Sequence, residues 1–138
     1  MSDGMNYAPV AREQAVVCQP GEFNIGVAHL DHGHIYGMTE NLKAAGATVA
    51  KVYDRNEKRI AYFKKLFPEA EVVNSVEALL NDTELQLIAA AAIPSLRGPF
   101  GLEVLAHGKD YFTDKTPFTS LEQLAAARSA VSSTSQKY

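Results

Sequence analysis

The residues best suited to chemistry lie in a short loop between an apolar run, residues 23–28, and a helical pattern that begins at Ile35. The loop consists of His29, Leu30, Asp31, His32, Gly33 and His34. Where a strand leads directly into a helix, unpaired backbone N–H groups and the positive end of the helix dipole converge. The loop is therefore predicted to hold the diphosphate group of a nucleotide, with Gly33 allowing the closest approach to the backbone.

An acid that suits such a nucleotide site is Asp54, which ends a second apolar run, residues 47–54. In dinucleotide-binding units, an acidic residue about 20 residues beyond the loop holds the adenosine ribose. A competing interpretation is local, because Asp54 and Glu57 have the spacing of a helix capping box. Arg55 can cover an adenine face, meet a 2′-phosphate or simply be solvated, so NAD and NADP are both predicted as cofactors.

The same loop offers metal ligands, because imidazole and carboxylate groups together suit zinc or iron. A metal-dependent enzyme is therefore one alternative. However, ligands packed into six consecutive residues at one turn point in several directions, and the sequence identifies no residue that would orient them by hydrogen bonds. We therefore favour a phosphate-facing loop and predict no metal site; plain turn and capping residues are the third interpretation.

Apolar runs and amphipathic segments alternate along the rest of the chain. The predicted strands cover residues 23–28, 47–54, 71–74, 85–93 and 110–113, and the predicted helices cover residues 35–45, 56–67, 75–80, 95–108 and 119–131. Ser95 and a capping box of Thr119 and Glu122 are expected to open the last two helices. This alternation predicts an α/β fold, a three-layer, doubly wound parallel sheet of Rossmann-like type. The expected strand order is 3-2-1-4-5, with the ligand crevice at the carboxyl ends of the first and fourth strands.

Length and composition limit the classes of protein that remain. The chain has 138 residues, which suit one domain at 23–138 after an irregular arm at 1–22. The net charge is −3, and acidic and basic residues are interspersed along the chain, so the sequence shows no basic patch of the kind that binds nucleic acid. The single cysteine, Cys18, and an N-terminus without a secretory pattern indicate a cytoplasmic protein. No apolar run is long enough to span a membrane.

Four stretches resemble the Gfo/Idh/MocA oxidoreductases. They are Leu-Asp-His-Gly-His-Ile at 30–35, Tyr53-Asp54, Ile-Pro-Ser-Leu-Arg at 93–97, and Gly-Lys-Asp-Tyr-Phe-Thr-Asp-Lys at 108–115. The last is the most specific, because it is similar to the family's Gly-Lys-x-Val-x-x-Glu-Lys-Pro segment. The resemblance covers residues 23–138 in order.

This resemblance implies an N-terminal Rossmann domain that binds NAD or NADP in an oxidoreductase acting on a sugar, a polyol or a related hydroxyl compound. The lysine that matches Lys115 lies beside the nicotinamide in the family and assists proton or hydride transfer. Asp114 precedes it, and the turn after the fourth strand presents groups to the cofactor: Ile93, Pro94, Ser95 and Arg97. The local alternatives are a helix cap for Ser95 and a surface pair with Asp114 for Lys115.

The family also has a larger C-terminal domain, which holds the small-molecule substrate and supplies further catalytic groups. The resemblance therefore implies a chain that binds cofactor weakly and catalyses nothing alone, and whose uncovered sheet edge could let copies self-associate. A non-catalytic nucleotide-binding or regulatory module is the second alternative. Two positions depart from the family pattern: His29 replaces the first glycine of the phosphate loop, and Thr116 separates Lys115 from Pro117. Histidine adds bulk near the diphosphate, although it tolerates a positive φ better than most residues.

Overall fold

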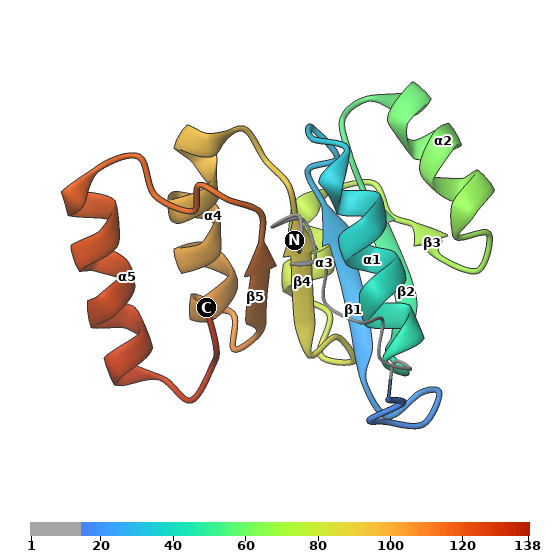
Figure 1. Cartoon of the computed structure of the whole chain (residues 1–138), viewed down its shortest axis with the longest axis horizontal. Coiled ribbons are helices and arrows are strands. Elements are labelled where there is room, and N and C mark those ends of the chain that lie inside the picture. The colour runs from blue at the N-terminus through green and yellow to red at the C-terminus, as the bar shows by residue number, and fades with distance from the viewer. Residues whose placement is uncertain (1–14) are drawn as a thin grey trace, which may run out of the picture.

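The computed structural model describes residues 15–138, in which strands and helices alternate throughout (Figure 1). The strands are β1 (Asn24–Ala28), β2 (Thr48–Tyr53), β3 (Glu71–Val72), β4 (Leu87–Ala90) and β5 (Asp110–Thr113). The helices are α1 (His34–Ala44), α2 (Glu57–Leu66), α3 (Val76–Leu80), α4 (Pro94–Ala106) and α5 (Leu121–Ser133). The expected irregular arm at 1–22 lies partly outside the described residues. Within residues 15–138, no helix is long and apolar enough to cross a lipid bilayer.

The five strands form one parallel sheet in the order β3-β2-β1-β4-β5, which confirms the predicted order. Central β1 pairs with β2 through Val27 and Val52 and with β4 through Ala28 and Ala90. All strands point the same way, so their carboxyl ends share one rim, the upper rim in Figure 1. The loops that carry the predicted site residues leave from this rim.

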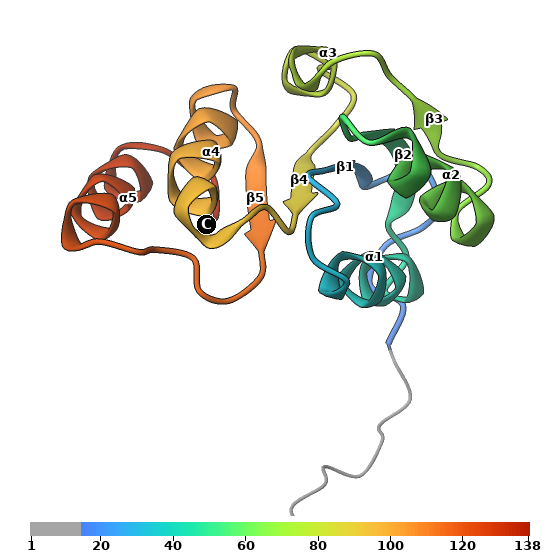
Figure 2. The same cartoon turned by 90° about the horizontal axis from the view of Figure 1, so that it is seen from above.

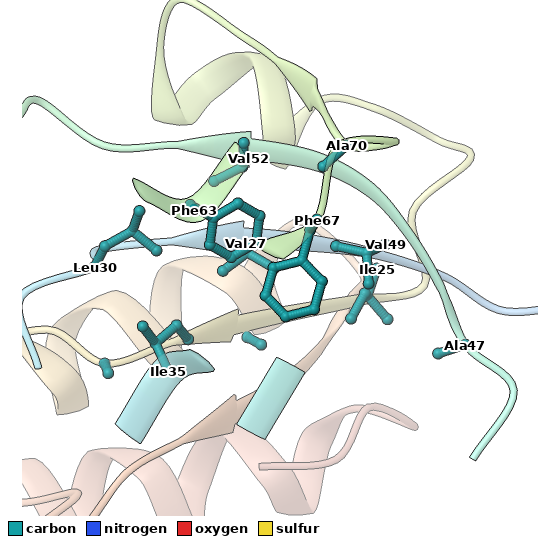
Figure 3. Close-up of a cluster of buried hydrophobic side chains, with 12 residues drawn as sticks. Ile25, Val27, Leu30, Ile35, Ala47, Val49, Val52, Phe63, Phe67 and Ala70 are labelled. Atoms are coloured by element: carbon teal, nitrogen blue, oxygen red, sulfur yellow. The ribbon is translucent and has the colours of Figure 1, made fainter. Parts of the chain in front are cut away.

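Helices cover both faces of the sheet, and Figure 2 shows α1 and α3 on opposite sides. On one face, Phe63 and Phe67 of α2 and Ile35 of α1 pack against β1 and β2 (Figure 3). On the other face, α3 and α4 pack against β1, β4 and β5, with Leu79, Phe100 and Val104 contributing to the cluster. The fold is therefore the predicted three-layer α/β arrangement, with α5 packed against α4 beyond the sheet (Figure 1).

The fourth strand is shorter than its apolar run, residues 85–93, had suggested. Beyond β4, the buried residue Ala91 leaves the ladder and bonds to the loop after β1. Its amide donates to the His29 carbonyl at 3.1 Å, and its own carbonyl accepts from the His32 amide at 3.1 Å. The apolar character of this segment thus reflects burial beneath a loop as well as burial within a sheet.

Three helices begin at different capping residues from those considered in the sequence. Asn56, not Asp54, caps α2, and its side chain accepts from the Lys58 and Arg59 amides. Helix α4 begins at Pro94, so Ser95 is already inside its first turn and does not cap it. Ser120, not Thr119, caps α5 through the Gln123 amide. The capping box predicted at 119–122 is therefore wrong, and so is the alternative interpretation of a capping box at 54–57.

Candidate functional site

The loop after β1 begins with His29 in the left-handed conformation, at φ +52°. Its side chain is mostly buried and packs edge to face against Phe100 of α4, with ring centroids 4.5 Å apart. Burial lowers the pKa of the His29 imidazole, although the charges of Asp31 and Asp54 oppose this shift. Histidine therefore adopts the backbone geometry that usually favours glycine, while its ring fills space beside the loop.

Two loop amides are held by neighbouring strands. The Leu30 amide donates to Asp54 Oδ2 at 2.7 Å, and the His32 amide donates to the Ala91 carbonyl at 3.1 Å. The Leu30 side chain points into the core between β1, β2 and α2 (Figure 3), so Leu30 anchors the loop rather than lining it. These contacts fix the path of the chain before it enters α1.

Gly33 occupies the N-cap position of α1, at φ −62° and ψ −17°, without a side-chain cap. The first turn of α1 also has no acidic residue. Within residues 15–138, no acceptor meets the Gly33 amide, and a Cβ placed on Gly33 would contact nothing within 4 Å. The positive end of α1 is therefore accessible to an anion.

Asp54 joins the end of β2 to this loop. One carboxylate oxygen accepts from the Leu30 amide, and the other accepts from the Asn56 amide at 2.8 Å. Arg59 Nη1 lies 3.8 Å from the Asp54 carboxylate and only 2.5 Å from Asp31 Oδ1. Asp31 is thus paired with α2, and Asp54 has a structural role whether or not it also binds a ribose.

A cavity of about 600 Å³ opens beside these residues, at the carboxyl ends of β1, β2 and β4. It is lined by His29, Asp31, Tyr53, Asp54, Arg55, Asn56, Glu57, Lys58, Arg59, Ile93 and Leu96. Its volume lies in the range of small-molecule and cofactor sites. The lining combines the half-exposed apolar side chains of Ile93 and Leu96 with Arg55, just before α2, and with Lys58 and Arg59 in the first turn of α2.

A second polar cluster surrounds Asp114, which directly follows β5. The nearest Asp114 oxygens lie 3.3 Å from His32 Nδ1, 3.0 Å from His34 Nδ1 and 3.6 Å from Arg97 Nη2. The Lys115 amide also donates to Asp114 Oδ1 at 2.8 Å. Burial raises the pKa of Asp114, but the hydrogen bonds with His34 and the Lys115 amide and the nearby positive charges outweigh it and lower the pKa.

Lys115 extends from this cluster toward solvent, with 78% of its side chain exposed. Its Nζ lies 3.4 Å from His34 Nδ1 and 3.9 Å from Asp114 Oδ1. By contrast, Arg97 is almost fully buried, and its guanidinium donates to the Ala92 carbonyl at 2.6 Å and to the Lys115 carbonyl. Arg97 therefore fixes the backbone at the rim and is poorly placed to reach a ligand.

The turn after β4 supplies backbone and apolar groups to the rim. Ile93 is the N-cap of α4, and Pro94 occupies its first turn. The Ser95 carbonyl accepts from Gln123 Nε2 of the α5 helix at 3.2 Å, while the Ser95 side chain is exposed. Nothing in this turn gives the α4 N-terminus a side-chain cap.

The structure divides the predicted residues into two groups on one rim. His29, Asp31, Asp54, Arg55 and Ile93 line the cavity, whereas His32, His34, Arg97, Asp114 and Lys115 form the second cluster. Sequence reasoning missed six lining residues: Tyr53, Asn56, Glu57, Lys58, Arg59 and Leu96. These residues lie next to Asp54 in the sequence or in the first turns of α2 and α4, and this proximity to the predicted site could have identified them.

Comparison with protein families places the chain in a known class. The family model described as the oxidoreductase family with an NAD-binding Rossmann fold matches residues 25–138. The chain belongs to the Gfo/Idh/MocA oxidoreductases, and residues 25–138 correspond to their NAD-binding Rossmann domain. No curated protein matches the chain.

Solved structures share the fold. A candidate oxidoreductase from Erwinia carotovora atroseptica is 39% identical, with a TM-score of 0.81 over 85% of this chain and 35% of that protein. The WlbA (WbpB) dehydrogenase from Thermus thermophilus, in complex with NAD and UDP-GlcNAcA, is 18% identical, with a TM-score of 0.72 over 84% of this chain and 40% of that one. The apo scyllo-inositol dehydrogenase of Lactobacillus casei is 14% identical, with a TM-score of 0.70 over 91% and 37%. This chain therefore spans little more than a third of the length of these proteins.

Proposed function

We propose that this chain is the cofactor domain of an NAD- or NADP-dependent oxidoreductase that acts on a sugar, a polyol or a related hydroxyl compound. The observation that carries the proposal is the cavity beside Asp54, whose lining includes Asp31, two residues before the N-cap of α1 at Gly33, which has no side-chain cap. Parallel α/β sheets bind nucleotides at this type of crevice, where a diphosphate can meet a helix N-terminus.

The cavity lining suits the adenosine half of a dinucleotide. Ile93 and Leu96 offer apolar surface for a base, and Asp54 offers a carboxylate for ribose hydroxyls. Arg55 and Lys58 give the same cavity positive charge that a 2′-phosphate would use. These features leave NAD and NADP as alternative cofactors and make their relative affinity the property to measure.

Lys115 is the proposed catalytic residue. Its exposed ammonium stands on the same rim as Gly33, where it can exchange a proton with a substrate hydroxyl group. The bound nicotinamide would supply the hydride chemistry. Ser95, the backbone at Ile93 and Pro94, and the His34 and Asp114 side chains would surround this end of the cofactor, with Arg97 holding the Lys115 backbone in place.

The remaining acid and base groups are proposed to come from a substrate domain like that of the longer relatives. The isolated 138-residue chain should then bind cofactor weakly and turn over no substrate. If Lys115→Ala leaves the activity of a longer enzyme containing this domain unchanged, the non-catalytic nucleotide-binding alternative is favoured. The cytoplasmic location inferred from Cys18 and the absence of a nucleic-acid partner also remain predictions.

Calorimetric titration of NAD and NADP into the chain tests the proposal. Asp54→Asn keeps one acceptor oxygen for the Leu30 or the Asn56 amide and removes the charge that would hold the ribose, so it should weaken binding by about tenfold. Glu40→Gln, at an exposed position on α1, is the matched control and should bind as the wild type does. Absence of binding at about millimolar concentrations of either nucleotide would contradict the proposal.

A further inference from the structure

Three potential metal ligands meet at the rim, although they come from distant parts of the chain. His32 and His34 flank Gly33, and Asp114 follows β5. One imidazole nitrogen from each histidine and one Asp114 carboxylate oxygen all lie within 4.8 Å of one another. His32 Nδ1 and His34 Nδ1 approach the same oxygen, Asp114 Oδ2, at 3.3 and 3.0 Å. His34 Nδ1 lies within hydrogen-bond distance of the Asp114 carboxylate, and His32 Nδ1 accepts from the His34 amide at 3.3 Å, so an ion at this point would replace these hydrogen bonds.

We propose that His32, His34 and Asp114 bind a divalent transition-metal ion, with zinc as the best-matched probe. Two imidazoles and one carboxylate form a donor set that zinc and neighbouring first-row metals accept. Ligands about 2.1 Å from an ion in tetrahedral or octahedral geometry are separated by roughly 3.0–3.4 Å, which is the spacing of these nitrogens from Asp114 Oδ2. This site excludes His29 and Asp31, which face the nucleotide cavity.

The third ligand is already oriented. The Asp114 side chain is only 10% exposed; its Oδ1 accepts from the Lys115 amide at 2.8 Å and lies 3.1 Å from His34 Nδ1, while Oδ2 lies within 3.3 Å of both histidines. The His32 backbone is held by the hydrogen bond from its N–H to the Ala91 carbonyl. The imidazole rings of His32 and His34 pack edge to face, with their centroids 4.3 Å apart. Such preorganisation by surrounding hydrogen bonds is typical of metal sites.

The site is open to solvent on its histidine side. The side chains of His32 and His34 are 51% and 50% exposed. Three protein ligands with an accessible face leave at least one coordination position for water or another small ligand, as in catalytic and exchangeable sites rather than closed structural ones.

Two positive charges oppose the ion and limit its affinity. Lys115 Nζ lies 3.4 Å from His34 Nδ1, and Arg97 Nη2 lies 3.6 Å from Asp114 Oδ2. The Lys115 ammonium is well exposed and can move away, whereas Arg97 is held by the Ala92 and Lys115 carbonyls. Metal binding must therefore displace the Lys115 ammonium, so removal of that charge should strengthen binding.

The test is calorimetric titration of zinc chloride into the full chain in a non-chelating buffer at about pH 7.5, with metal content of the purified protein measured in parallel. One ion should bind per chain. His32→Gln and His34→Gln should each weaken binding by about tenfold or more, because a ligand is lost. Lys115→Met should tighten binding by about threefold or more, through loss of the competing charge.

Two control variants test whether zinc binds at a different place on the chain. His107→Gln changes an exposed histidine outside the cluster, and Cys18→Ser removes the thiol; both should bind zinc as the wild type does. Circular dichroism melts should show that every variant is folded. The proposal is overturned if the wild type shows no saturable binding at about 100 μM zinc, or if folded His34→Gln binds as tightly as the wild type. Binding lost in Cys18→Ser or His107→Gln would place the ion elsewhere and would also overturn it.

Discussion

His29 combines two features at the site: a left-handed backbone conformation and a buried side-chain contact. The loop needs a positive φ at this position, and a residue other than glycine adopts it here because the imidazole gains a buried contact with Phe100. Burial also disfavours the charged imidazolium, so the pKa of His29 is lowered in the folded chain. The residue that replaces the family glycine therefore makes the loop sensitive to pH.

Stability should fall in mild acid because of His29. Its folded pKa lies below the unfolded value of 6.5, so at pH values between the two the unfolded chain binds the extra proton. The free energy of unfolding, measured with urea, should therefore decline as the pH falls below about 6.5. His29→Asn tolerates a positive φ but cannot titrate, so its decline should be smaller. Equal declines in the two proteins would refute this assignment.

Gly33 should matter for binding rather than for folding. Its φ is negative and a Cβ there meets nothing, so Gly33→Ala should change the free energy of unfolding by no more than about 1 kcal/mol. The added methyl group would nevertheless stand beside the amide proposed to meet the diphosphate, and NAD affinity should drop.

Gly37→Ala is the matched control for this change, because Gly37 also has open space and lies one turn further along α1. It should stabilise the helix by up to about 1 kcal/mol and leave NAD binding unchanged. Thermal unfolding and calorimetry of both variants separate the two effects. Equal NAD affinity in Gly33→Ala and the wild type would argue against a diphosphate at this amide.

At the scale of elements, the sequence predicted the order of strands and helices but not how their ends are fixed. Thr119 and Ser120 both have a partner at capping-box spacing, and in the structure Ser120 is the cap, while its partner Gln123 also donates to the Ser95 carbonyl of α4. Asp54 does not cap α2, because its carboxylate accepts a hydrogen bond from the amide of Leu30, a residue distant in the sequence. The ends of these helices are fixed partly by contacts between residues distant in sequence, which the local spacing of residues cannot predict.

The buried arginine is the clearest example of such a contact. Its position in the turn after β4 suggested a group presented to the cofactor, yet Arg97 joins the end of β4 to the loop after β5 through the Ala92 and Lys115 carbonyls. A sequence pattern does not distinguish an arginine whose guanidinium faces solvent from one whose guanidinium is buried and donates to two backbone carbonyls. Whether Arg97 also influences cofactor binding stays a prediction.

Arg97→Lys should therefore destabilise the fold. Lysine carries one charged nitrogen in place of a planar fork, so at least one buried carbonyl would lose its donor, at a cost of about 2–4 kcal/mol. Urea unfolding measures this loss. Arg128→Lys, at an exposed position on α5, is the control and should stay within about 0.5 kcal/mol of the wild type. A similarly small change for Arg97→Lys would show that the buried network contributes little.

For the whole molecule, alternation of apolar runs was sufficient to predict a parallel sheet in the order 3-2-1-4-5, because right-handed crossovers allow few alternatives. The covering of β5 was not predictable. The Tyr111 amide donates to the Lys137 carbonyl at 2.8 Å, and the Tyr138 ring packs against Tyr111 and Phe118. This contact covers part of a sheet edge that was expected to be exposed. Association of copies through this edge stays a prediction.

Gly101 of α4 makes room for this C-terminal packing. A Cβ on Gly101 would lie 2.4 Å from a Tyr138 ring atom and 2.6 Å from a Tyr111 ring atom. Gly101→Ala should therefore destabilise the chain by about 1–3 kcal/mol, despite the better helix propensity of alanine. Thermal unfolding measures the effect, and Gly37→Ala again provides the helical glycine without neighbours. A stabilised Gly101→Ala variant would mean that the tyrosine rings shift at little cost.

The central claim, that a dinucleotide binds between Asp54 and Gly33, is tested most directly by titrating NAD and NADP into ¹⁵N-labelled chain and following the backbone amides by NMR. The largest shifts should occur at Leu30, Gly33, Arg55 and Leu96, on the rim around the cavity, with residues of α5 unchanged. Shifts confined to other surfaces, or none with either nucleotide at about millimolar concentration, would contradict the account.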